Sequence, residues 1–322
     1  TNYVGVGPAA IVLAVGLGLV LLGFLLIVQA LKGQLALPSE DEEEAPFSRP
    51  AFLMALATFV EEVMTTEAAM ELAWNADAWT KQDGAASRAY LAGWTRREFG
   101  ERASAALVDY YNAYFAAPGR YGTAEDRTFS DCAYNTLARH ILTKLLIGKT
   151  EKPEGDMPVE NYRAFAERLR KIAAQAEPRW TAARDLAGRA AKLIAPDRKQ
   201  FFQSHVATQL DVHEYGNRAL LRIAEAYLAG SPAERKRYVA AAIADLERIL
   251  ASYQASEYGK WAGYYRGELF ANVRLTHRMA HAYAGVLDGK PIPAGLPVQA
   301  RTPDPYPTLK AYQGARRTTT AP

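Results

Sequence analysis

Cysteine is nearly absent from this chain of 322 residues, which contains Cys132 alone. A single thiol excludes a disulfide framework within the chain, a paired-cysteine zinc site, an iron–sulfur cluster and a c-type haem attachment. The sequence also has no GxGxxG, GxxxxGKS/T or GxSxG segment, the motifs that bind dinucleotides or phosphates or hold a nucleophilic serine. We therefore expect no nucleotide, no cofactor, no metal and no catalytic residues, and predict that the protein is not an enzyme.

An excess of charge of one sign is lacking as well. The 38 Lys and Arg residues nearly balance the 35 Asp and Glu residues, which gives a formal net charge of +3. A nucleic-acid-binding module usually has a concentrated basic face, and no part of the sequence approaches one. The proportions of hydrophobic residues (49%) and charged residues (23%) are those of a globular protein, so the composition excludes wholesale disorder.

Residues 4–30 contain no charged side chain at all. As a helix this segment would be about 40 Å long, more than the roughly 30 Å of a bilayer core, so it could cross a membrane with some tilt. The alternative is a signal peptide, which needs a basic start and an apolar region of only about 7–15 residues. The segment has neither of these features, so we predict a single transmembrane anchor over residues 1–32.

Small residues recur every four positions in this segment, at Ala10, Ala14 and Gly18. Such spacing lets helices approach closely in lipid, so we expect these residues to pack against a partner helix, although Gly and Ala are common in any membrane helix. The segment contains no histidine and offers no imidazole ligand for a haem or a chlorophyll magnesium.

The rest of the chain divides into three parts. Residues 33–50 are acidic and rich in proline, which is typical of a linker. Residues 51–287 have helical periodicity interrupted at Gly and Pro positions and predict an antiparallel bundle of about seven or eight helices. One break is expected at Pro178. The Ser231–Glu234 segment has the pattern of a capping box. The fold class predicted is therefore all-α.

The C-terminal residues 288–322 hold seven of the 17 prolines and no apolar periodicity. An extended, polyproline-like tail is expected there. Within it, Pro303, Pro305, Tyr306 and Pro307 are the residues that we expect to contact a partner.

Several polar residues interrupt apolar stripes in the predicted bundle: His213, Asn217, Glu268 and Asn272. Because buried polar groups need hydrogen-bond partners, we interpret these residues as a network between helices. The alternative is the remnant of a binding cleft. Abundant tyrosines, such as Tyr110, Tyr111 and Tyr114, favour a core or an interface over a carbohydrate platform.

Two histidines, His277 and His281, are four residues apart on one predicted helix. This spacing would let two imidazoles share a metal ion. The intervening Arg-Met-Ala lacks the glutamate of HExxH, and no third ligand follows at a defined spacing, so we interpret both as surface or helix-end residues. Cys132 and His140 lie about two helical turns apart, which gives weak support for a nucleophile pair.

Two stretches carry a resemblance to a known family. Trp94–Gly100 reads W-T-R-R-E-F-G, and the run that begins at Phe201–Gln203 passes Asn217 and reaches G-K-W-A-G-Y-Y-R-G at Gly259–Gly267. Their order and spacing resemble the α-helical accessory domain of family 115 glycoside hydrolases, the xylan α-glucuronidases. The resemblance covers roughly residues 85–285. It implies a helical domain without the family's separate catalytic domain, and no catalytic position of the family has a counterpart here.

These features predict a membrane-anchored structural subunit that braces a larger bacterial membrane complex, for example a photosynthetic reaction centre–antenna complex or a respiratory complex. Its expected partners are integral-membrane subunits and the lipid bilayer of the inner membrane. The resemblance to exported enzymes favours a periplasmic body. The alternatives are an anchored carbohydrate-binding or carbohydrate-active protein and an anchored scaffold that recruits a soluble partner through its tail.

Overall fold

The computed structural model describes residues 64, 67, 68, 85–119, 121, 131–148, 161–267 and 271–300. The chain forms two compact units, Thr1–Ala73 and Trp74–Pro322, and every helix named below belongs to the second unit. The predicted membrane anchor, the linker and the partner-contact residues of the tail lie outside the described residues. No helix of the described part is both long and apolar enough to cross a membrane.

The described part of the chain is helical and has no strand, which confirms the all-α prediction for these residues. Its helices are α5 (Ala85–Phe99), α6 (Glu101–Ala116), α7 (Asp131–Ile147), α8 (Tyr162–Ala191), α9 (Lys199–Phe202), α10 (Thr208–Leu228), α11 (Pro232–Ser256) and α12 (Val273–Leu287). A π-helical turn, Gln203–Ala207, joins α9 to α10. Short 3-10 helices lie at Pro196–Arg198, Gly259–Trp261 and Tyr264–Gly267.

The capping box predicted before α11 is present. The Ser231 side chain accepts a hydrogen bond from the Glu234 backbone N–H, and the Glu234 carboxylate accepts one from the Ser231 backbone N–H. Pro232 occupies the first turn, where its missing N–H costs nothing. The buried residues that follow recur every three or four positions: Val239, Ala242, Leu246, Ile249 and Tyr253. This stripe is the face of α11 that packs on the bundle.

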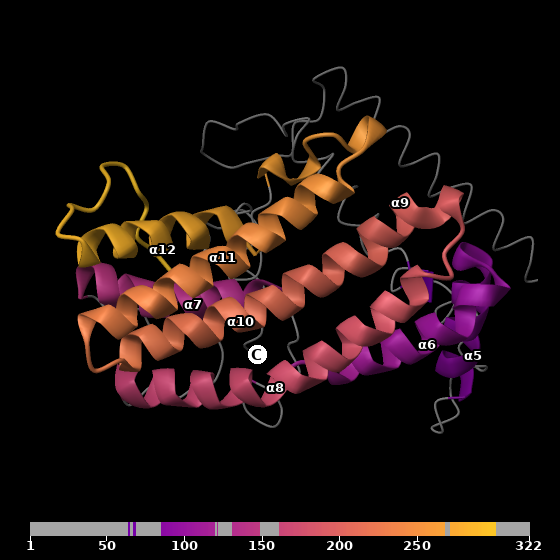
Figure 1. Ribbon diagram of the computed structural model, residues 1–322, viewed down its shortest axis with the longest axis horizontal. Helices are drawn as coiled ribbons and strands as arrows, with labels where there is room; N and C mark the ends of the chain where they lie inside the picture. The colour runs from indigo at the N-terminus through magenta and orange to yellow at the C-terminus, as the bar shows by residue number, and fades with distance from the viewer. Residues whose placement is uncertain are drawn as a thin grey trace, which may run out of the picture. The chain divides into compact units, whose positions relative to one another are not determined.

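The break expected at Pro178 is wrong, because α8 continues through this residue. A proline inside a helix removes one backbone hydrogen bond and costs about 3 kcal/mol. The face of α8 around it is fully buried at Ala173, Ala176, Trp180 and Ala183. Burial of this face outweighs the local cost, and α8 changes direction near its middle without ending (Figure 1).

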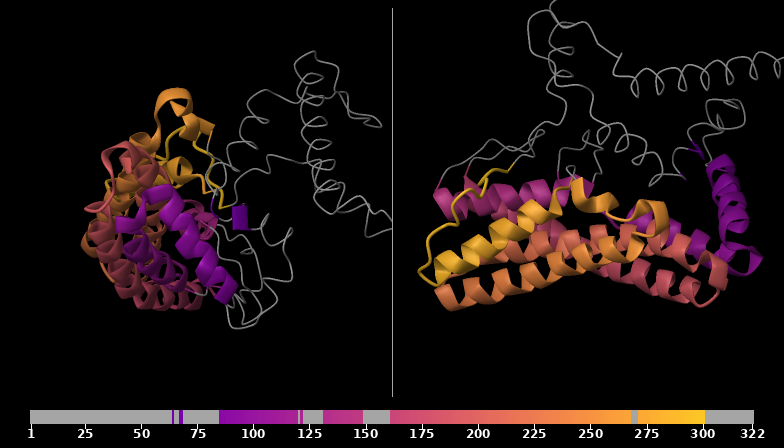
Figure 2. Two further views of the ribbon diagram at one scale, coloured as in Figure 1. Left: turned by 90° about the vertical axis from the view of Figure 1, so that its right-hand side faces the viewer. Right: turned by 90° about the horizontal axis from the view of Figure 1, so that it is seen from above.

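Helix α10 is at the centre of the second unit, where it packs against α7, α8 and α11. Helix α12 packs on α11 and α7, and α6 packs on α8. The long helices run roughly side by side (Figure 1), whereas α5 packs on α6 across one end (Figure 2). The approach of α10 to α7 is close at Gly216, where an added Cβ would lie 3.2 Å from Tyr134 Cδ2. Glycine is therefore the residue that fits this crossing.

Candidate functional site

Two of the polar residues predicted to be buried, His213 and Asn217, lie inside the bundle on α10. The Asn217 amide donates a hydrogen bond to the Ala173 carbonyl on α8 (2.9 Å) and accepts one from the Tyr121 hydroxyl (2.9 Å). The His213 ring stacks on Trp180, with ring centroids 5.6 Å apart. Both residues therefore join α10 to its neighbours in the core, and neither is presented to a cleft.

A larger charged network that sequence reasoning missed involves the same stretch of α10, Asp211 to Arg218. The fully buried Glu214 forms ion pairs with Arg184 of α8 and with Arg218 (2.7 Å). Arg184 also contacts Asp211 (2.5 Å). The Asp211 carboxylate accepts a further hydrogen bond from Ser252 of α11 (2.6 Å). The sequence did contain a sign of this network, because charged residues recur at three- and four-residue spacing on one helix, at Asp211, Glu214 and Arg218.

Tyr215 adds an aromatic surface to the same region. The guanidinium groups of three arginines lie over its ring at 5.0–5.4 Å from the centroid: Arg184, Arg218 and Arg248. Such contacts stabilise a cation by about 0.5–2 kcal/mol each. Two of these arginines also pair with the carboxylates of Asp211 and Glu214, which offset two of the three positive charges. The network has the character of a structural clamp between α8, α10 and α11.

A second clamp is formed by Arg139 of α7, which is fully buried. Its Nε donates to the Ala300 carbonyl (2.7 Å), and its Nη1 donates to the Ala271 carbonyl (2.8 Å) and to the Thr276 hydroxyl (2.9 Å). The acceptors come from the end of the described chain, the turn before α12 and α12 itself. One guanidinium thus holds three segments against α7.

Asn272 was predicted to belong to a polar network between helices, but its side chain caps a helix. It is the N-cap of α12, in a left-handed conformation (φ 46°, ψ 53°), and its side chain accepts a hydrogen bond from the Leu275 N–H (3.2 Å). Two short 3-10 helices, Gly259–Trp261 and Tyr264–Gly267, precede it in the chain, so it does not interrupt an apolar stripe within a helix. Glu268, its expected neighbour in the network, lies outside the described residues.

The tyrosines for which the sequence favoured a core or an interface over a carbohydrate platform are in the core. Tyr110 is fully buried and Tyr111 and Tyr114 nearly so, and Phe115 is the exposed aromatic residue among these four. The three tyrosine rings therefore have no face available for stacking on a sugar. His140 is also fully buried, and the side chain of its suggested partner Cys132 lies outside the described residues.

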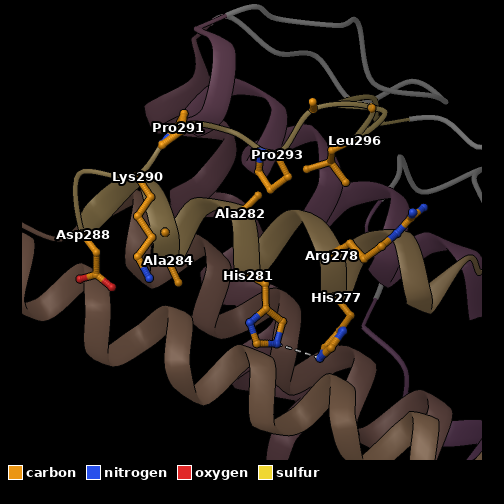
Figure 3. A pocket seen from close by; sticks show the side chains of 13 residues that line it. His277, Arg278, His281, Ala282, Ala284, Asp288, Lys290, Pro291, Pro293 and Leu296 are labelled. Atoms are coloured by element: carbon orange, nitrogen blue, oxygen red, sulfur yellow. Dashed lines mark hydrogen bonds between the residues drawn. The ribbon is translucent and has the colours of Figure 1, made fainter.

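A surface groove of about 630 Å³ lies between α12 and the irregular segment that follows it (Figure 3). His277 and His281 are in its wall, together with Asp288, Lys290 and Leu296. The two histidines approach each other, with their Nε2 atoms 3.1 Å apart.

A carboxylate joins the two histidines from the neighbouring helix α11. The Glu247 Oε1 atom lies 3.6 Å from His277 Nε2 and 3.9 Å from His281 Nε2. Sequence reasoning missed Glu247 because it lies 30 residues before His277 on another helix, and no local spacing connects them.

We expect Asp245→Asn to stabilise the fold at neutral pH. Burial raises the pKa of Asp245 to about 6, against the lowering influence of Arg218, Arg222 and Arg248. The unfolded chain ionises Asp245 near pH 4, so between pH 4 and 7 the charged carboxylate costs the folded state free energy. The side chain is partly exposed, so we expect a gain of about 1 kcal/mol at pH 7 and none at pH 3.5. Thermal unfolding of both proteins across this pH range measures it, and an equal gain at both ends would contradict it.

No family model, no curated protein and no solved structure matches this chain. The resemblance to the accessory domain of family 115 glycoside hydrolases therefore has no support beyond the residues that suggested it.

Proposed function

We propose that this chain is a non-enzymatic, membrane-anchored accessory subunit that braces a larger membrane complex. The observation that carries the proposal is the uncharged run over residues 4–30, joined to a helical body. The run has the length and composition of a transmembrane helix. A bracing role needs a rigid body more than it needs a reactive site.

The helical body supports this role through the way it uses its polar groups. The charged residues of α8 and α10 pair with one another, and Arg139 of α7 binds the backbone carbonyls of Ala271 and Ala300. Ion pairs and hydrogen bonds between helices favour one arrangement of those helices. Large apolar side chains exposed at Phe115 and Tyr258 offer contact points for neighbouring subunits.

The proposed partners are integral-membrane subunits that pack against the anchor at Ala10, Ala14 and Gly18. The proposed location is a bacterial inner membrane with the body on the periplasmic side. A photosynthetic or respiratory complex is the kind of host that we propose.

The test is gentle detergent extraction from the source membrane, followed by native separation and mass spectrometry of the chains that migrate together. We expect the wild-type chain to migrate with a defined set of integral-membrane subunits. Leu21→Arg places a charge in the middle of the anchor, at a cost of about 2.5–3.5 kcal/mol, and is expected to reduce the membrane-bound fraction, whereas Leu21→Ala serves as the control. Gly18→Leu is expected to stay in the membrane but to lose the partner subunits.

Two results would contradict the proposal. Migration of the wild-type chain alone, near its own mass plus detergent, would exclude a bracing role. Recovery of the chain in the soluble fraction without detergent would exclude the anchor.

A further inference from the structure

We propose that His277, His281 and Glu247 form a binding site for one divalent first-row transition ion, of which Zn²⁺ fits best. Nothing in the bracing role requires this site. It is carried by the geometry of the three side chains.

The separations of the three ligand atoms match a shared ion. They are 3.1 Å between the two Nε2 atoms and 3.6 and 3.9 Å from these atoms to Glu247 Oε1. The point in the plane of the three atoms that is equidistant from them lies about 2.1 Å from each. This is the length of a Zn–N or Zn–O bond. The side chains therefore surround a space of the right size before any ion enters it.

The backbone holds the ligands in place from two rigid elements. His277 and His281 are four residues apart on α12, so both rings lie on the face toward α11. Glu247 lies opposite them because α11 and α12 pack side by side and antiparallel, an arrangement that also brings Lys236 of α11 within 2.6 Å of Asp288, which follows α12. Sites built on packed helices are more precise than sites on loops.

The protonation state also suits a metal. Burial and the nearby His281 ring lower the pKa of His277, against the raising influence of Glu247, and the neutral ring is the form that binds metals. The side chain of Arg278 extends away from the two rings (Figure 3), which keeps its charge out of the site.

The donor set selects the class of ion. Two imidazole nitrogens and one carboxylate suit Zn²⁺ and its neighbours, whereas Mg²⁺ and Ca²⁺ prefer oxygen ligands alone. Three protein ligands leave at least one coordination position open. Because both histidines also line the groove beside α12, we infer that this position is taken by water or by a donor atom of a small molecule in the groove.

The experiment uses the full chain, purified without a polyhistidine tag and freed of metal with EDTA. Isothermal titration with ZnCl2 is expected to show one ion per chain, and MgCl2 no binding. We expect His277→Gln, His281→Gln and Glu247→Gln each to weaken Zn²⁺ binding about tenfold or more. His205→Gln and Asp288→Asn are the matched controls, since the first removes an imidazole elsewhere and the second removes a carboxylate of the same groove. Both controls are expected to bind Zn²⁺ as the wild type does.

A spectroscopic signature identifies the ligands directly. In His281→Cys loaded with Co²⁺, we expect a thiolate-to-cobalt charge-transfer band that the wild type lacks, although both contain Cys132. Circular dichroism of each variant checks that it is folded, which the surface position of Glu247 and His281 favours, since their side chains are 58% and 52% exposed.

Each of three results overturns the site. They are no binding of Zn²⁺ to the wild type, unchanged binding by Glu247→Gln, and a His281→Cys variant that is folded but gives no charge-transfer band.

Discussion

Replacing Arg139 by methionine is expected to lower the free energy of unfolding by about 3–5 kcal/mol. Methionine fills most of the space but donates no hydrogen bond. The buried carbonyls of Ala271 and Ala300 and the Thr276 hydroxyl would lose the hydrogen bonds from this guanidinium, and a buried group that loses its hydrogen bond costs about 1–3 kcal/mol. Urea denaturation followed by circular dichroism measures the loss.

The controls separate the hydrogen bonds from the bulk of the side chain. Arg139→Lys keeps a charge and three donors but not the planar fork, so its loss should lie between those of the wild type and of the methionine variant. Thr136→Ala removes only the longest contact of the guanidinium (3.3 Å) and is expected to cost less than about 1 kcal/mol. Hydrogen exchange should rise at Ala300 and at the start of α12 in Arg139→Met. A cost below about 1 kcal/mol for this variant would show that the clamp is not what stabilises these segments.

The second large loss of folding stability is expected for Glu214→Ala. Glu214→Ala leaves Arg184 and Arg218 without their shared carboxylate. Breaking a buried ion pair from one side costs about 3–5 kcal/mol. The two arginines are partly exposed, with side-chain exposures of 36% and 27%, and water will recover part of the loss, so we expect about 3 kcal/mol.

Glu225→Gln is the matched control for Glu214. It breaks the pair with Arg222 three residues earlier on the same helix, for which we expect less than about 1 kcal/mol. Denaturant unfolding in low and high salt gives a second measurement. Because salt screens exposed pairs more than buried ones, the loss for Glu225→Gln should fall more in high salt than the loss for Glu214→Ala. Equal losses for the two variants would contradict the assignment of Glu214 as the centre of the network.

Local patterns in the sequence predicted the helices of the described part. The features that they did not predict, at Pro178 and Arg139, depend on contacts between residues far apart in the chain. The capping box and the apolar stripe gave the start and the buried face of α11 because both are properties of neighbouring residues. Pro178 was misread because tertiary burial of α8 outweighs a local preference. Arg139 gave no signal, since its acceptors lie 132 and 161 residues away at Ala271 and Ala300.

In the candidate metal site, too, the sequence revealed the local feature and missed the long-range contact. The spacing of His277 and His281 was visible in the sequence, and it was set aside for want of a third ligand. The third ligand depends on the antiparallel register of α11 and α12, which only the folded structure supplies.

The Arg139 clamp has a consequence for the order of folding. Its acceptors at Ala271 and Ala300 are synthesised long after α7, and closing so long a loop is entropically costly. Until they arrive, burying the guanidinium would deprive its Nε and Nη1 donors of these acceptors, at a cost of several kcal/mol. We therefore expect α7 to dock fully only after α12 and the segment up to residue 300 have formed. The guanidinium would then act as a late checkpoint that favours completed chains over truncated ones.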